Sequence, residues 1–500
     1  MNQPGDIEDW PDIYTSKLVP DSLLDQCLDL LEKGFDVKTI AQDSGIPYHS
    51  LVHALSCRYF DEGNPDMARH LIEDVAVVSR DTRLIIQLIR SVFAAPEDDE
   101  PALLAYVRLL AESIALGDDE VRLTPSPEKR NSNKTRIAFL CSWAFSRLFE
   151  FSIIPMIRNM DRDLFEIGLL ALKNERSPEV PAEFLCHFDF VERLEAGQNN
   201  ASLTKILRHD IDILFDLNGH LCVDNPTSAL MRKPARILVN WFNSPVSSGL
   251  SSYDYYLTDQ YTVPEWNRHL FTEKIFYLDC GCAATFELPA RPIQNAPASE
   301  GYSFVFNSFN EVFKLNPLTL QVWAEVLRRA PESALVLKAN SLAATHSRKT
   351  THIRRYLIDA AGIEPGRVLI TPPRTFEGML DDYGTADLSL GPIRYNGLTT
   401  TINSLWMGVP VICFIGKKAE DRGAGAVLNQ VGLQEFMAHS IEDYVEKAVD
   451  LARTPNKLFE LRKNMRERLD RSAYFNPALF AASFERACNE MMRVYGKTKR

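Results

Sequence analysis

Apolar residues recur at every third or fourth position along the first quarter of the chain. One stripe consists of Leu23, Leu24, Cys27, Leu30 and Leu31. A second stripe runs along residues 102–111. This spacing places the apolar side chains on one face of each helix. The pattern predicts an all-helical N-terminal domain over residues 1–125, followed by a polar linker at residues 126–134.

Two shorter patterns in this domain bear on what it contacts. Residues 37–55, with Gly45 between two apolar stretches, have the spacing of a helix-turn-helix. An ordinary helical hairpin explains the same spacing, and we favour it because basic residues are sparse there. Residues 59–81 resemble one helix of a tetratricopeptide repeat, although no period of 34 residues recurs clearly. We expect a degenerate helical-repeat region that contacts a protein partner or a second copy of the chain.

After the linker, short β-like runs alternate with helical stretches. The first group of expected strands covers residues 137–141, 165–172, 211–216 and 236–241. The second group covers residues 303–306, 334–338, 368–370, 386–390 and 411–414. A Pro-rich segment at residues 289–297 separates the two groups. Such alternation predicts two parallel sheets with helices on both faces.

The predicted fold class is therefore α/β, with two Rossmann-like lobes and an all-α N-terminal domain. We expect the first lobe over residues 135–290, the second over residues 301–470, and a C-terminal helix over residues 471–500. Ligands of such sheets bind beyond the carboxyl ends of the strands. The site is thus expected in the cleft between the lobes.

Two loops of the second lobe carry candidate chemistry. The run Asn396-Gly-Leu-Thr-Thr400 starts a predicted helix over residues 399–407, where free N–H groups, hydroxyls and the helix dipole can hold a phosphate. A Thr N-cap without any ligand explains that run equally well. Lys314 follows a predicted strand, where its ammonium can neutralise a diphosphate leaving group. Taken alone, a solvated loop lysine explains Lys314 better, but two candidate sites on one cleft support each other.

These residues resemble the O-GlcNAc transferase family of glycosyltransferases, including its SPINDLY-like group. The second lobe contains Phe309-Asn-Glu-Val-Phe-Lys314 and Leu320-Gln-Val-Trp323, followed by Asn396-Gly-Leu-Thr-Thr400 leading to Leu405-Trp-Met-Gly-Val-Pro410. The first lobe contains Asp216-Leu-Asn-Gly-His220 and a segment from Arg232 to Trp241 that are similar to the family's motifs. The similarity extends over about residues 136–451 in a consistent order.

The resemblance implies a GT-B fold, a nucleotide-sugar co-substrate that is usually a UDP-sugar, inversion at the anomeric carbon, and neither a cofactor nor a metal. It places the diphosphate at Lys314 and at the helix start, the ribose at Asn403, and the base at the loop from Thr371 to Arg374. The residues that the resemblance assigns to donor binding are Asn310, Glu311, Lys314, Thr371, Arg374, Asn396, Gly397, Leu398, Thr399, Thr400 and Asn403.

Several positions depart from the family pattern. Leu398 replaces a common His, Asn403 an Asp, and Glu311 a Gln. The His that many relatives carry after the first strand is also missing, so the identity of the catalytic base stays open. His220 is our candidate base or acceptor-orienting residue, because an imidazole can accept a proton near neutral pH. A His satisfied by backbone groups in a turn explains it equally well, and Glu150 is a weaker candidate.

Composition narrows the function classes further. Lys and Arg number 55 against 67 Asp and Glu, so the net charge of −12 disfavours binding to nucleic acid or to anionic membranes. The nine Cys are dispersed without zinc-ligand spacing, which is typical of reduced thiols. Neither a signal sequence nor a run of 18 apolar residues is present, so we expect a cytoplasmic protein.

We therefore expect an inverting, metal-independent glycosyltransferase that moves a hexose or N-acetylhexosamine from a UDP-sugar to a Ser or Thr hydroxyl of a protein. A different donor nucleotide or an Asn acceptor is an alternative. A noncatalytic GT-B scaffold that binds a partner is a second hypothesis, although the retained Lys314 and Thr residues argue against it. A nucleic-acid-binding regulator built on residues 37–55 is a third, which the acidic balance disfavours.

Overall fold

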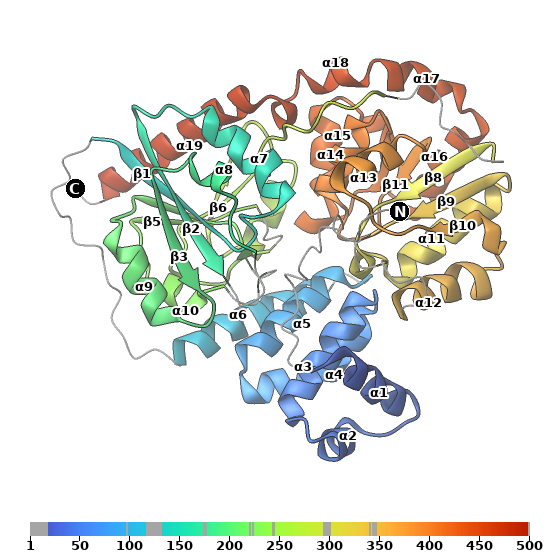
Figure 1. Ribbon diagram of the computed structural model, residues 1–500, viewed down its shortest axis with the longest axis horizontal. Coiled ribbons are helices and arrows are strands. Elements are labelled where there is room, and N and C mark those ends of the chain that lie inside the picture. Colours follow the sequence, from blue (N-terminus) through green and yellow to red (C-terminus); the bar gives the residue numbers. More distant parts are fainter. Residues whose placement is uncertain are drawn as a thin grey trace.

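The computed structural model describes residues 19–96, 99–116, 133–173, 178–219, 222, 225–242, 246–293, 302–339, 342 and 348–498. These residues form a helical region and two α/β lobes (Figure 1). In the view of Figure 1 the helical region, in blue, lies below both lobes. The predicted fold class is confirmed in this arrangement.

The helical region consists of helices that each pack against the next. They are α1 (Asp21–Glu32), α2 (Val37–Ser44), α3 (Tyr48–Asp61), α4 (Pro65–Ser79), α5 (Thr82–Ala94) and α6 (Glu100–Leu116). The turn after α2 uses Gly45 in the left-handed conformation, with φ of 69°. Helix α3 buries most of its side chains, whereas a helix that reads a DNA groove needs an exposed face. This burial supports the helical-hairpin interpretation of residues 37–55.

The first lobe is built on a parallel sheet with the order β3-β2-β1-β4-β5-β6-β7. Its strands are β1 (Thr135–Cys141), β2 (Phe165–Lys173), β3 (Phe190–Glu195), β4 (Ile213–Asp216), β5 (Ile237–Asn240), β6 (Tyr255–Thr258) and β7 (Lys274–Tyr277). Helices α7 (Arg147–Arg158), α8 (Ala182–Leu185), α9 (Asn199–Arg208) and α10 (Thr227–Met231) connect them, with a 3₁₀ helix η2 (Glu265–Leu270) before β7.

The second lobe repeats this winding, with the parallel order β10-β9-β8-β11-β12-β13. Its strands are β8 (Phe304–Ser308), β9 (Ser333–Leu337), β10 (Val368–Ile370), β11 (Leu388–Leu390), β12 (Val411–Phe414) and β13 (Met437–Ala438). Its helices are α11 (Pro317–Arg329), α12 (Arg348–Arg354), α13 (Phe376–Tyr383), α14 (Leu398–Trp406), α15 (Gly423–Gln430), α16 (Ile441–Arg453), α17 (Asn456–Lys463) and α18 (Met465–Leu469). Short helical turns are η3 (Val312–Lys314), η5 (Arg355–Ala360), η6 (Pro365–Arg367), η7 (Ala419–Asp421), η8 (Gln434–Phe436) and η9 (Ala473–Phe475).

The last helix, α19 (Pro477–Thr498), returns to the first lobe (Figure 1). Its Phe484 packs against Phe215 and Trp241 of the first sheet, at ring-centroid distances of 4.8 and 5.1 Å. Helix α7 of the first lobe also meets the second lobe, because Phe151 lies 4.9 Å from Phe376. The last helix thus packs on the first lobe, and the contact of Phe151 with Phe376 joins the two lobes directly.

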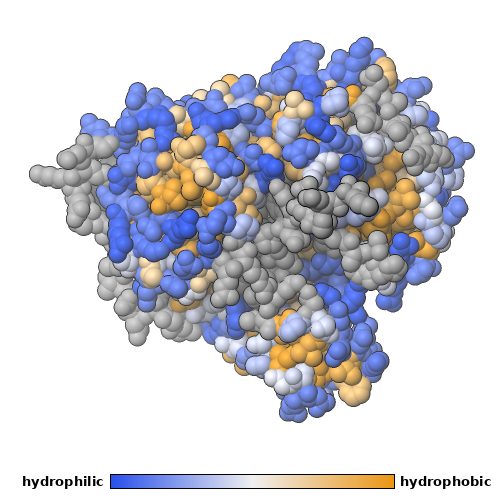
Figure 2. Space-filling view, viewed as in Figure 1, coloured by the Kyte–Doolittle hydropathy of each residue, from blue (hydrophilic) through white to orange (hydrophobic). Residues whose placement is uncertain are grey.

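One hydrophobic core is shared between the helical region and the first lobe. It joins residues of α3 and α5 to Leu140, Leu170 and Leu214 of the first sheet, and it also includes Phe313 of the second lobe. The coloured part of the face shown in Figure 2 is mostly hydrophilic, with an apolar area over the helices at the bottom of the view. Exposed apolar side chains of the helical region include Phe35, Met67, Val77 and Val78.

Candidate functional site

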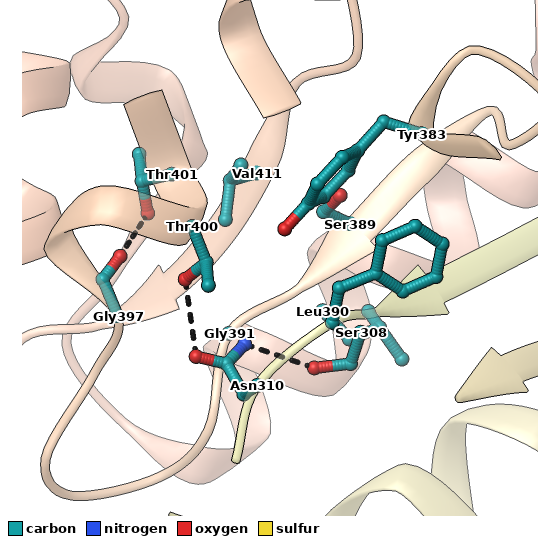
Figure 3. A pocket seen from close by; sticks show the side chains of 11 residues that line it. Ser308, Asn310, Tyr383, Ser389, Leu390, Gly391, Gly397, Thr400, Thr401 and Val411 are labelled. Carbon is teal, nitrogen blue, oxygen red and sulfur yellow. Dashed lines mark hydrogen bonds between the residues drawn. The ribbon is translucent and has the colours of Figure 1, made fainter. Parts of the chain in front are cut away.

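The order of strands reverses between the neighbouring strands β8 and β11. The loops that follow these two strands therefore run to opposite sides of the sheet, which leaves a crevice at the carboxyl ends of the strands. A pocket of about 230 Å³, partly open to solvent, lies there (Figure 3). Both predicted cleft loops contribute to it. The pocket is lined by Ser308, Phe309, Asn310, Tyr383, Ser389, Leu390, Gly391, Gly397, Thr400, Thr401 and Val411.

Helix α14 begins at this pocket, one residue before its predicted start, and Gly397 is its N-cap. Among the described residues, no side chain caps its first N–H groups. The Thr400 hydroxyl instead donates to Asn310 Oδ1 at 3.0 Å, and the Thr401 hydroxyl to the Gly397 carbonyl at 2.6 Å (Figure 3). The simple Thr-cap alternative is therefore not what the structure contains. The helix keeps unpaired N–H groups and the positive end of its dipole for an anion.

Gly397 leaves room that any side chain would fill. A Cβ atom at this position would lie 1.9 Å from Thr400 Oγ1 and 2.3 Å from Asn310 Oδ1. Real Cβ contacts do not come that close, so the two loops can approach each other only because residue 397 is Gly. The close approach brings backbone, hydroxyl and amide groups of β8 and α14 to one wall of the pocket.

Asn396 holds the loop in front of α14. Its buried side chain donates to the carbonyls of Phe414 and Asp421 and accepts from the Ala424 N–H at 2.9 Å. These bonds occupy the amide with protein groups. We therefore expect Asn396 to shape the phosphate loop rather than to contact the donor with its side chain, a refinement of the direct role that we expected.

Lys314 lies in η3, directly after the β8 loop, and is half-buried. Its ammonium lies 4.5 Å from the ring centroid of Tyr395 and 5.8 Å from that of Phe313. Burial lowers the pKa of Lys314 to about 8, while Glu311 acts in the opposite direction. A bound diphosphate would favour the charged form of such a lysine. Lys314 is thus packed against two rings and is not a fully solvated loop lysine, but it does not line the pocket at β8 and β11, and its contact with a diphosphate stays a prediction.

The other predicted donor residues are distributed unevenly. Leu398 and Thr399 occupy the first turn of α14, where Leu398 packs against the core of the second lobe. Asn403 lies one turn further along and is buried, and its Oδ1 has no hydrogen-bond partner in the described part of the chain. A buried carbonyl without a partner is costly. Asn403 does not line the pocket, however, and its contact with a ribose stays a prediction.

The predicted base-binding loop follows β10, at the edge of the sheet and two strands away from β8. The Thr371 N–H donates to the Leu337 carbonyl at 3.0 Å, and the exposed Arg374 pairs with Asp382 at 2.7 Å. Neither residue lines the pocket at β8 and β11. Their contact with a base therefore stays a prediction.

Sequence reasoning missed two residues beside the pocket. Lys338, at the end of β9, is buried and pairs with Asp382, and its ammonium lies 5.6 Å from the Phe309 ring centroid. The rule that singled out Lys314, a lysine at a strand end, would have found it. Tyr383 is fully buried in the pocket wall, its hydroxyl points into the pocket, and that hydroxyl has no partner among the described residues (Figure 3). No sequence pattern indicates Tyr383, because its position depends on packing.

The first lobe has its own polar cluster where its strand order reverses, between β1 and β4. Asp216 is buried and accepts from the Tyr253 hydroxyl at 2.6 Å and from Asn225 at 2.9 Å. Asn218 accepts from the Ser142 N–H at 2.8 Å. The network fixes the loop that leads to residue 220. The predicted base, His220, lies outside the described residues.

Glu150, the weaker base candidate, lies in the first turn of α7 and pairs with Arg147 at 2.7 Å. The described residues contain no group of three or more His, Cys, Asp or Glu side chains that could hold a metal ion. Among the helices that the structure describes, none combines the length and the apolar character that crossing a membrane requires.

Comparison with known sequences gives one family. Residues 129–286 and 294–484, more than half of the chain, match glycosyl transferase family 41. The chain is 32% identical over 306 residues to the probable UDP-N-acetylglucosamine–peptide N-acetylglucosaminyltransferase SPINDLY of Arabidopsis thaliana, covering 60% of this chain and 33% of that protein. It is 28% identical over 312 residues to the SEC protein of the same plant, which carries the same enzyme description, covering 60% and 31%. The chain spans about a third of the length of these curated relatives.

Comparison with solved structures supports the fold. An O-GlcNAc transferase mutant from Thermobaculum terrenum superposes with a TM-score of 0.81 at 24% identity. The match covers 96% of this chain and 92% of that one, so it includes the helical region as well as both lobes. The two-lobed arrangement is thus that of a GT-B glycosyltransferase.

Proposed function

The chain belongs to glycosyl transferase family 41, and from that premise we propose that it transfers a sugar from a UDP-sugar to a Ser or Thr hydroxyl of a protein. The observation that carries the proposal is the contact between Asn310 and the uncapped start of α14 at the strand reversal, with Lys314 four residues further along the loop that carries Asn310. That set supplies the cation and the N–H donors that a diphosphate requires.

The proposed reaction is a single displacement with inversion. The acceptor oxygen attacks the anomeric carbon, the bond from that carbon to the phosphate oxygen breaks, and UDP leaves with the electron pair. Lys314 and the N–H groups of α14 stabilise the charge that grows on the leaving phosphate, a role that other enzymes give to a metal. The acceptor proton passes to a base, for which His220 and Glu150 are the candidates.

The sugar is proposed from the relatives. The SPINDLY and SEC proteins are both named as enzymes that use UDP-N-acetylglucosamine and act on peptides. This supports an N-acetylhexosamine ahead of a simple hexose and a protein ahead of a small-molecule acceptor. The exposed apolar side chains of the helical region suit contact with a protein, which would then present its acceptor hydroxyl to the cleft. We also propose a cytoplasmic location, which the dispersed cysteines, typical of reduced thiols, support.

A transfer assay tests the proposal. The purified protein is incubated with UDP-N-acetylglucosamine, other UDP-sugars and a library of Ser- and Thr-containing peptides in EDTA, and the products are analysed by mass spectrometry. We expect a sugar adduct on peptide hydroxyls and inverted anomeric configuration by NMR. Lys314→Ala should abolish transfer, whereas Lys457→Ala, an exposed lysine that pairs with Asp450, should not. Donor binding without transfer to any acceptor would favour a noncatalytic scaffold.

A further inference from the structure

An aromatic stack connects the N-terminal helices to the segment that carries Lys314. Phe60 of α3 stacks on Phe313, with ring centroids 5.2 Å apart. Phe93 of α5 meets Tyr395 edge-on at 5.1 Å, and Tyr395 and Phe313 lie 5.6 Å from each other. The residue beside Lys314 therefore packs in the core of the helical region, not in that of its own lobe.

Tyr395 is the ring nearest to the ammonium of Lys314. The distance from Nζ to the Tyr395 ring centroid is 4.5 Å, within the range in which the negative face of an aromatic ring attracts a cation. In the part of the chain that the structure describes, no carboxylate lies within ion-pair distance of Nζ. The ring is thus the contact that fixes the direction of this lysine.

The backbone that presents Tyr395 is strained. Arg394 and Tyr395 are consecutive residues with positive φ, 66° and 39°, a conformation that side chains other than that of Gly rarely adopt. Such a turn persists only when its surroundings hold it. Arg394 donates to the carbonyl of Pro96, at the end of the helical region, at 3.1 Å. It also pairs with the buried Asp421 of the second lobe at 2.7 Å.

Two further contacts fix the helical region against the site. Asn316, directly after η3, donates to the Ala94 carbonyl at 3.3 Å and to the Ile393 carbonyl at 3.1 Å. The turn between α3 and α4 approaches so closely that a Cβ at Gly63 would lie 2.8 Å from the Leu315 carbonyl oxygen. The segment that carries Lys314 and the turn that carries Tyr395 are therefore both held against the helical region.

We propose that α3 and α5 support the segment that carries Lys314 from behind, and that Tyr395 is the positioning residue that directs Lys314 toward the diphosphate. The inference rests on the proposed function, because it takes Lys314 as the phosphate-binding cation. It gives the helical region a part in donor binding, in addition to the acceptor contact expected of it. Changes in the packing of these helices would then alter the use of the donor.

The test compares Tyr395→Leu with Tyr395→Phe. Leu removes the ring, whereas Phe keeps the ring face and removes only the hydroxyl. We expect Tyr395→Leu to weaken UDP binding about tenfold and to lower kcat, with little change in the KM for the acceptor peptide. Tyr395→Phe should remain within about twofold of the wild type, because the cation still meets a ring. Phe93→Leu, which keeps Tyr395 and weakens the packing behind it, should fall between the two.

A control and a second readout separate positioning from folding. Tyr302→Leu removes a ring of the same lobe whose hydroxyl bonds the Gly366 carbonyl, and it should leave UDP affinity unchanged. Thermal unfolding gives the folded fraction of each variant, and affinity is expressed per folded molecule. If Lys314→Ala weakens UDP binding but folded Tyr395→Leu binds like the wild type, the inference is overturned and the proposed function stands. If the wild type binds no nucleotide, both are overturned.

Discussion

Gly397 offers the sharpest perturbation of the phosphate loop, because an added methyl group has no space there. In Gly397→Ala the new Cβ would lie 1.9 Å from Thr400 Oγ1. Restoring an ordinary contact of about 3.4 Å requires a shift of about 1.5 Å in one of the two groups. The hydrogen bond from Thr400 to Asn310 would then break. The same movement displaces the first turn of α14, whose N–H groups we assign to the diphosphate.

The expected magnitudes follow from these contacts. Overpacking of a filled site costs about 1–3 kcal/mol, and a lost hydrogen bond about 1 kcal/mol. We therefore expect Gly397→Ala to lower the free energy of unfolding by about 2–4 kcal/mol in the absence of a ligand. Donor binding should weaken about a hundredfold, because a displacement of about 1 Å in positioning groups has that effect on catalytic geometry.

Urea unfolding and calorimetric titration with UDP measure the two effects. Gly366→Ala is the matched control, because it lies in the same lobe, needs no positive φ, and its Cβ would approach nothing closer than the Tyr302 hydroxyl at 3.7 Å. This control should change neither quantity by more than about 0.5 kcal/mol. Wild-type UDP affinity in a folded Gly397→Ala protein would refute the assignment of the phosphate to this helix start.

Four further predictions concern buried or half-buried polar groups. Tyr383→Phe should keep or raise the melting temperature, because the hydroxyl that it removes is buried without a partner among the described residues. Tyr444→Phe should instead destabilise the protein by about 1–2 kcal/mol, because it loses the hydrogen bond to the Gly391 carbonyl. Differential scanning calorimetry compares the two variants, and an equal loss of stability in both would contradict this reasoning. UDP affinity should fall as pH rises through about 8, because Lys314 loses its proton there in the free protein. Calorimetry at several pH values should show this fall for the wild type and not for Lys314→Ala. The same pH profile in both proteins would assign the fall to another group. The contribution of Lys314 to the free energy of unfolding should instead rise with pH between 8 and 10.5, the ordinary pKa of the group, because the unfolded chain binds more protons than the folded chain there. Urea unfolding measures this free energy. A difference between wild type and Lys314→Ala that stays constant across that window would contradict the prediction. Arg348→Ala should destabilise the protein by about 1–3 kcal/mol at pH 7, because the buried Glu62 loses one of its two Arg partners. The loss should be smaller at pH 4, because burial raises the pKa of Glu62 and favours its uncharged form as the pH falls. Urea unfolding at the two pH values checks this, and an equal loss at both would contradict it.

The sequence predicts the strands that lie inside the sheets better than those at the edges. All nine expected strands are present, since runs such as residues 137–141 are apolar and buried on both faces. The strands β3 and β7 were not predicted. They lie at the edges of the first sheet, and half-exposed polar residues interrupt their apolar sequence. The strand β13, another edge, has only two residues, Met437 and Ala438. The central strand β6 was also missed, because Tyr255–Thr258 is short and mixes apolar with polar residues.

The site divides in the same way. Lys314 and the start of α14 could be predicted, because a strand end and a helix start are local features of the sequence. Tyr383 and Tyr395 could not, because their importance comes from which residues they meet across the fold. The contact of Tyr395 with Phe93 joins residues about 300 positions apart, and no local pattern encodes it. The role of Asn396 needed the structure for the same reason, since its partners lie at the end of the next strand and in the segment that follows it.

The central claim is that the crevice between β8 and β11 binds a nucleoside diphosphate through Lys314 without a metal. Calorimetric titration of the purified protein with UDP, and in parallel with GDP, in the presence of EDTA tests it most directly. The account predicts micromolar binding of UDP that Lys314→Ala weakens by at least tenfold and that Lys457→Ala leaves unchanged. Tight binding of GDP alone would contradict the donor that we propose. Absence of binding by either nucleotide would contradict the claim itself.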